Sequence, residues 1–112
     1  MSRILFVDDC EDTLEIYKML FEQDGREIFT EINPEIALNR ILSENFDLVV
    51  TDHEMPGMTG EELIKKVHSE NPNLPFIMVS GNPPEEALDC LVFLKPVSIE
   101  SLENAIKRLL NE

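Results

Sequence analysis

Five short apolar runs recur along the chain, and their alternation with helical patterns constrains the fold more than any other feature. Each run is rich in β-branched or aromatic residues; the runs are Ile4–Val7, Ile28–Ile32, Leu48–Thr51, Phe76–Ser80 and Leu91–Leu94. Amphipathic stretches with helical spacing lie between them. Strands that alternate with helices predict a parallel sheet with helices on both faces, and near-continuous apolar strands agree with a sheet buried on both sides. The pattern therefore predicts an α/β fold of the (βα)5 type.

One interval departs from this pattern. Only residues 81–90 separate the fourth apolar run from the fifth, and Pro83-Pro84 occupies two of those positions. A helical crossover between parallel strands usually takes about a dozen residues, and proline begins a helix but disrupts its interior. We therefore expect a shortened or irregular fourth helix, with about one or two turns over Glu85–Cys90. The last helical stretch is the strongest, and Ser98 is its expected N-cap.

The balance of charges excludes several classes of function. Against 9 Lys and Arg the chain has 23 Asp and Glu, which gives a net charge of −14 at pH 7. Nucleic-acid binding needs a basic surface, and an anionic membrane would repel this chain. No apolar run is long enough to span a bilayer, and Cys10 and Cys90 fit neither a disulfide framework nor a zinc site. We expect a single cytoplasmic domain over residues 1–112 that binds neither nucleic acid nor membranes.

Polar residues that can carry chemistry stand at the ends of four predicted strands. They are Asp8-Asp9 after the first, Asp52 after the third, Ser80 at the end of the fourth and Lys95 after the fifth. In an open α/β sheet, ligands bind outside the carboxyl ends of the strands, so these side chains are expected to converge. Close carboxylates strain the fold, raise a pKa or recruit a cation, and oxygen ligands with open water positions suit Mg2+. A carboxylate-bound metal beside a lysine and a hydroxyl favours phosphoryl chemistry, whereas the glycines form neither a P-loop nor a dinucleotide fingerprint.

These residues resemble the receiver domain of two-component response regulators. The run Asp52-His53-Glu54-Met55-Pro56-Gly57-Met58-Thr59-Gly60 matches a highly specific motif of that family, and the other strand-end residues follow in the family's order. The resemblance covers the whole chain and implies a flavodoxin-like doubly wound sheet. It implies that Asp52 accepts a phosphoryl group from a histidine kinase or a histidine phosphotransfer protein. By the same resemblance Asp9, Asp52 and the backbone carbonyl of Glu54 bind Mg2+ directly, and Asp8 acts mostly through a metal-bound water.

The resemblance also assigns the switch that follows phosphorylation. Ser80 would hydrogen-bond the phosphoryl oxygens, Lys95 would pair with them, and the Lys95–Pro96 peptide bond would be cis. Repositioning of the hydroxyl and its loop would then alter binding to a downstream protein target. The domain would act as a signalling switch, with at most self-phosphorylation and self-dephosphorylation chemistry of its own.

Three features depart from the family pattern near the fifth strand. The position of the usual aromatic switch residue holds Val92, and Phe93 is one step later, on the opposite face of the strand, so we expect Phe93 to be a core residue. Gly81 replaces a common alanine, and the segment from Ser80 to Lys95 is short. Our hypothesis is that the phosphorylation chemistry is retained but its readout is weak or uses another surface. The effect of the Glu54 side chain on the lifetime of the phosphoryl group stays open.

Two other classes of function compete with this interpretation. A phosphatase of the haloacid dehalogenase type would need an acid/base aspartate two residues after Asp8, where Cys10 stands. A pseudo-receiver, an interaction module that never carries phosphate, is favoured by the short segment 81–90 and disfavoured by the complete acceptor set.

His53 is expected to line its loop and His68 to lie on a solvated helix face. The cognate kinase, the output target and the oligomeric state do not follow from the sequence.

Overall fold

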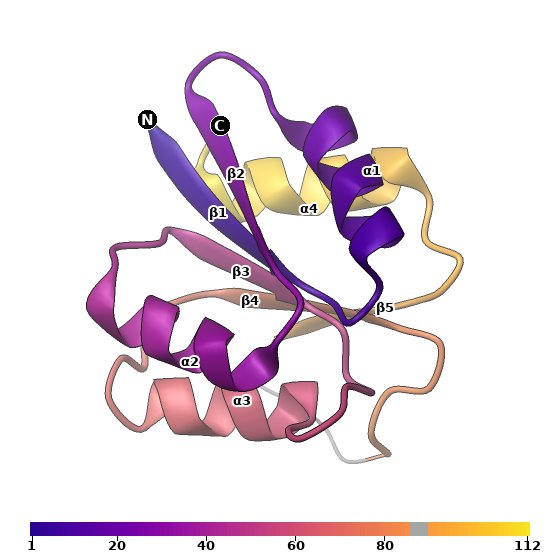
Figure 1. Cartoon of the computed structure of the whole chain (residues 1–112). Coiled ribbons are helices and arrows are strands. Elements are labelled where there is room, and N and C mark those ends of the chain that lie inside the picture. Colours follow the sequence, from indigo (N-terminus) through magenta and orange to yellow (C-terminus); the bar gives the residue numbers. More distant parts are fainter. Residues whose placement is uncertain (86–89) are drawn as a thin grey trace.

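The computed structural model describes residues 1–85 and 90–112, and within them five strands form one parallel sheet (Figure 1). The strands are β1 (Ser2–Val7), β2 (Arg26–Glu31), β3 (Leu48–Thr51), β4 (Phe76–Ser80) and β5 (Leu91–Leu94). Their order is β2-β1-β3-β4-β5, and every neighbouring pair is parallel. This is the flavodoxin-like doubly wound order, so the predicted fold class is confirmed.

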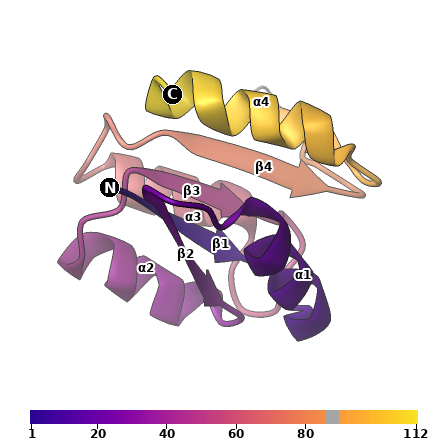
Figure 2. The ribbon, with the colours of Figure 1, turned by 90° about the horizontal axis from the view of Figure 1, so that it is seen from above.

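Helices cover both faces of the sheet. The helices are α1 (Glu11–Phe21), α2 (Pro34–Ser43), α3 (Gly60–His68) and α4 (Ile99–Leu110). In Figure 1, α1 and α4 lie above the sheet and α2 and α3 below it, and Figure 2 shows the upper pair from above. The helix predicted over 85–90 falls mainly on residues 86–89, which lie outside the described residues, so it stays a prediction. No helix among the described residues is long and apolar enough to cross a membrane.

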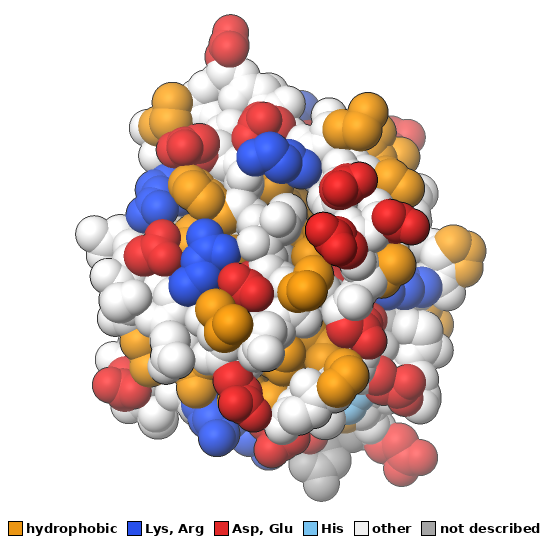
Figure 3. Space-filling view, in the orientation of Figure 1, with side chains coloured by type: hydrophobic (Ala, Val, Ile, Leu, Met, Phe, Trp, Pro, Cys, Tyr) orange, Lys and Arg blue, Asp and Glu red, His pale blue; other side chains and the backbone are white. Residues whose placement is uncertain are grey.

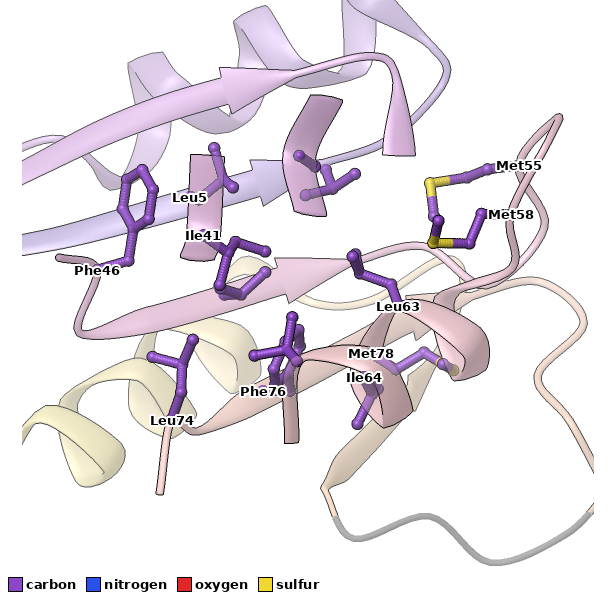
Figure 4. Packing of buried hydrophobic residues seen from close by; sticks show 14 residues of the cluster. Leu5, Ile41, Phe46, Met55, Met58, Leu63, Ile64, Leu74, Phe76 and Met78 are labelled. Atoms are coloured by element: carbon purple, nitrogen blue, oxygen red, sulfur yellow. The ribbon is translucent and has the colours of Figure 1, made fainter. Parts of the chain in front are cut away.

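The core consists of two clusters, one on each side of the sheet. Alternate residues of β1 divide between them, because Leu5 and Val7 face α2 and α3 whereas Ile4 and Phe6 face α1 and α4. Met55 and Met58, in the loop before α3, are buried in the first cluster (Figure 4). Their burial ties the loop that follows β3 to the core.

Local signals in the sequence fix where three helices begin. Asn33, Thr59 and Ser98 each accept backbone hydrogen bonds as N-caps, as predicted for Ser98. At Thr59 the cap is reciprocal, because the Glu62 side chain also accepts a hydrogen bond from the Thr59 backbone. This capping box holds the start of α3 in place directly after the Asp52 loop.

The edge strand β5 differs from the central strands in its burial. Leu91 and Phe93 pack against the core, whereas Val92 and Leu94 are exposed. The prediction that Phe93 belongs to the core is therefore confirmed, although its side chain is only half-buried. Ile32, the last residue of the second apolar run, lies outside β2 and is also exposed.

Arg26, at the start of β2, is fully buried. Its guanidinium donates to both carboxylate oxygens of Glu103 at 2.8 and 2.9 Å, to Glu112 at 2.5 Å and to the carbonyl oxygen of Phe21 at 3.1 Å. The pKa of Glu103 is lowered, chiefly by the hydrogen bonds from Arg26. One buried cation thus ties β2 to the end of α1, to α4 and to Glu112.

Candidate functional site

The predicted residues meet at the carboxyl edge of the sheet. Asp8 follows β1 and Asp52 follows the neighbouring strand β3. The backbone N–H of Asp52 donates to the carbonyl of Val7 at 2.9 Å, so the two strands are still paired where the acidic residues begin. The register between β1 and β3 therefore brings both side chains to the same place.

Three carboxylates form a tight cluster there. Asp8, Asp9 and Asp52 each offer an oxygen, and these oxygens lie within 4.8 Å of one another. Two unit charges at about 5 Å repel by about 3 kcal/mol at an effective dielectric constant near 20. Burial raises the pKa of Asp8, and the nearby charge of Asp52 raises it further. Hydrogen bonds from the Cys10 backbone and the Lys95 side chain oppose this rise. The cluster is therefore unfavourable without a counter-ion.

Lys95 supplies part of the missing positive charge. Its ammonium donates to Asp8 Oδ2 at 3.1 Å and to Asp52 Oδ2 at 3.2 Å. Burial by itself lowers the pKa of Lys95, but the hydrogen bonds and charges of Asp8 and Asp52 outweigh burial, and the net pKa is raised. The Lys95–Pro96 peptide bond is cis, as predicted. Lys95 thus bridges two of the three carboxylates.

Asp52 is held by groups on both sides of it in the chain. The His53 backbone N–H donates to Asp52 Oδ1 at 2.6 Å, and the Thr51 hydroxyl donates to the Asp52 carbonyl oxygen at 2.8 Å. The His53 ring accepts a hydrogen bond from the Glu61 backbone at 3.3 Å, so His53 caps the start of α3. This contact agrees with the expectation that His53 lines its loop.

Gly60 packs against the backbone of Asp52. A Cβ at position 60 would lie 2.2 Å from the Asp52 carbonyl oxygen and 3.0 Å from the Met78 side chain. Alanine normally stabilises a helix relative to glycine by about 1 kcal/mol. Here we expect Gly60→Ala to destabilise the domain by about 1–3 kcal/mol, because the loop holding Asp52 must shift.

Gly81→Ala is the matched control for this prediction, because a Cβ at Gly81 would meet nothing within 4 Å. Its effect on the free energy of unfolding should stay within about 0.5 kcal/mol. Both variants are compared by denaturant unfolding. A Gly60→Ala variant as stable as the parent would contradict the close approach to Asp52.

Ser80, the last residue of β4, and Glu54, in the loop after β3, stand beside the cluster. Ser80 is buried, and its hydroxyl oxygen accepts a hydrogen bond from the Asn82 backbone at 3.1 Å. The Glu54 side chain is exposed, accepts a hydrogen bond from the Asn82 side chain and shares a surface hollow with Asp9. Asn82 is a site residue that the sequence reasoning missed, because nothing in a short polar loop indicates which side chains meet.

The donor set of the cluster fits a hard divalent cation. It consists of carboxylate oxygens close enough to share one ion, which is the ligand type that Mg2+ prefers. Acidic side chains are also spread over the face of the molecule seen in Figure 3. The prediction that His68 lies on a solvated face of its helix is wrong, because its half-buried ring packs edge-on against Phe76 and forms a hydrogen bond with the Leu74 carbonyl oxygen at 2.8 Å.

Comparison with known proteins agrees with this geometry. Residues 4–107 match the family model of the response regulator receiver domain. The chain belongs to this family. It is 31% identical to the response regulator receiver protein CpdR of Brucella abortus, and the match covers 98% of both proteins. The chain is also 34% identical over 91 residues to the putative two-component response regulator ARR21 of Arabidopsis thaliana. That match covers 78% of this chain and only 15% of the relative.

Solved receiver structures share the whole fold. The CheY-like receiver domain protein of Methanospirillum hungatei superposes with a TM-score of 0.91 at 32% identity, covering 99% of this chain and 94% of that one. The response regulator TrrA of Thermotoga maritima, solved in complex with Mg2+ and BeF, superposes with a TM-score of 0.88 at 32% identity, covering 98% of this chain and 100% of TrrA. TrrA in a structure with the histidine kinase ThkA superposes with a TM-score of 0.86 at 31% identity, covering 98% of this chain and 99% of that one. Receiver domains are signalling domains rather than classical enzymes.

Proposed function

We propose that this receiver domain accepts a phosphoryl group on Asp52, with Mg2+ bound by the acidic cluster, and changes conformation to alter partner binding. The observation that supports this most is the arrangement around Asp52. Its carboxylate lies with Asp8 and Asp9 in one cluster and pairs with Lys95 Nζ at 3.2 Å. That combination offers a nucleophile, a cation site and a fixed positive charge together.

The transfer step uses these groups in distinct roles. An Asp52 oxygen attacks the phosphorus of a phosphohistidine, the P–N bond breaks, and its electron pair stays on the imidazole nitrogen. Asp8, Asp9, Asp52 and the Glu54 backbone carbonyl would hold Mg2+, which when bound neutralises charge on the phosphoryl oxygens. Lys95 then turns from Asp52 toward a phosphoryl oxygen, and the Ser80 hydroxyl donates to another. Attack of water on the acyl phosphate would reverse the modification, releasing inorganic phosphate and restoring the Asp52 carboxylate.

Partners follow from the same chemistry. The donor is a histidine kinase or a histidine phosphotransfer protein, and a downstream protein target reads the change. Residues 1–112 would act as one cytoplasmic domain that binds neither nucleic acid nor membranes. The −14 net charge supports the exclusion of nucleic acid.

Beryllofluoride, a phosphoryl mimic, tests the proposal against the pseudo-receiver alternative. With Mg2+ present, we expect one equivalent to bind and raise the thermal unfolding temperature, because the complex stabilises the native state. Chelation of Mg2+ or the substitution Asp52→Asn should abolish the shift. A pseudo-receiver would show no Mg2+-dependent binding even at high ligand concentration.

A further inference from the structure

A hydrogen bond joins two loops at the mouth of the acceptor site. The side-chain amide of Asn82, after β4, donates to Glu54 Oε1, after β3, at 2.5 Å. Both loops leave the same edge of the sheet (Figure 1). We call this contact the Glu54–Asn82 bridge.

The bridge is coupled to the Ser80 hydroxyl, which hydrogen-bonds a phosphoryl oxygen in the proposed function. The backbone N–H of the same Asn82 donates to Ser80 Oγ at 3.1 Å. Among the described residues, no hydrogen bond joins the Ser80 side chain to Asp52. The bridge therefore holds the loop in an arrangement in which Ser80 faces Asn82 rather than the acceptor.

The bridge also holds a negative charge beside the site. Glu54 lines the same surface hollow as Asp9, one of the three clustered aspartates. On phosphorylation the single charge of the Asp52 carboxylate is replaced by an acyl phosphate of about −1.5 to −2, which repels a carboxylate fixed nearby more strongly. Once released from Asn82, Glu54 is free to turn away into solvent.

From these two effects we propose that the Glu54–Asn82 bridge is a latch that stabilises the unphosphorylated arrangement and opens when Asp52 carries a phosphoryl group. The inference rests on the proposed function. The position of Ser80 and the charge of Glu54 both disfavour the phosphorylated state while the bridge is closed, so breaking the bridge favours that state. Because the bridge is one exposed hydrogen bond, we expect its loss to raise the affinity for the phosphoryl mimic about three- to tenfold.

A double-mutant cycle on beryllofluoride affinity, at saturating Mg2+, tests the latch. Asn82→Ala is expected to tighten binding about three- to tenfold and to speed exchange of the backbone amides at positions 81 and 82 in the mimic-free protein. In a Glu54→Ala background the same substitution should change the affinity less than about twofold, because the bridge is already broken. Both side chains are exposed, so the variants are expected to fold like the parent.

Two further substitutions separate charge from hydrogen bonding. Glu54→Gln keeps an acceptor for the Asn82 amide but removes the charge, so Asn82→Ala should still have an effect in that background. Glu85→Ala removes an exposed carboxylate from the loop after β4 and should leave the affinity unchanged.

Weaker or unchanged binding by Asn82→Ala, or an equal effect with and without Glu54, would overturn the latch. If the parent itself binds no beryllofluoride, the proposed function fails instead. The two failures are therefore distinguishable.

Discussion

Replacing Lys95 by alanine is expected to slow phosphoryl transfer to Asp52 by about 10²- to 10³-fold, the usual effect of losing one fixed group that stabilises charge in a transition state. Lys95 Nζ lies 3.2 Å from Asp52 Oδ2 and 3.1 Å from Asp8 Oδ2. Transfer is measured from a phosphohistidine donor or from acetyl phosphate, under single-turnover conditions.

The same substitution should raise the affinity for Mg2+, because the ammonium no longer competes for Asp8 and Asp52. Opposite changes in transfer rate and Mg2+ affinity are not expected from a merely structural role. Lys107→Ala, which removes an exposed lysine from α4, is the control and should alter neither quantity. A Lys95→Ala variant that transfers at the parent rate, or that binds Mg2+ more weakly, would contradict the role given to Lys95.

Replacing Arg26 by alanine is expected to lower the free energy of unfolding by about 3–5 kcal/mol, because Glu103 and Glu112 lose their partner and a buried side chain is removed. The thermal midpoint should fall by more than about 10 °C. Arg108→Ala, an exposed arginine of α4, should cost less than about 0.5 kcal/mol. Equal midpoints for the two variants would show that the buried cation does not hold β2 to α4.

The Arg26 contact also predicts how stability depends on pH. Hydrogen bonds from Arg26 lower the pKa of Glu103 below its ordinary value of 4.5, so the unfolded chain binds the proton more tightly than the folded one. The resulting stabilisation is complete above pH 4.5 and is lost as the pH falls through the lowered pKa. Arg26→Ala should lose this part of the acid dependence, which denaturant titrations between pH 3 and 6 would reveal.

The convergence of the site was predictable because it depends on topology alone. In a parallel sheet the carboxyl ends of neighbouring strands meet at one edge, so apolar runs followed by Asp8, Asp52 and Lys95 predict a cluster. Strand boundaries were less predictable. β2 starts at Arg26 rather than at Ile28 because its polar first residues pair in register with Ser2 and Arg3.

Long-range and loop contacts could not be predicted from the sequence. Arg26 looks like a surface residue until Glu103 and Glu112, 77 and 86 positions later, are brought beside it. The Glu54–Asn82 bridge joins two polar loops 28 positions apart, and no periodicity governs such a pairing. Gly60 was visible as part of a motif, but only the geometry gives its reason, the approach to the Asp52 carbonyl.

Locating the added phosphoryl group on the chain tests the account most directly. After incubation with acetyl phosphate and Mg2+, peptide mass mapping should find the modification on Asp52 alone, and chelating the metal should prevent it. Modification of His53, His68 or another carboxylate in place of Asp52, or equal labelling without a divalent cation, would contradict the account.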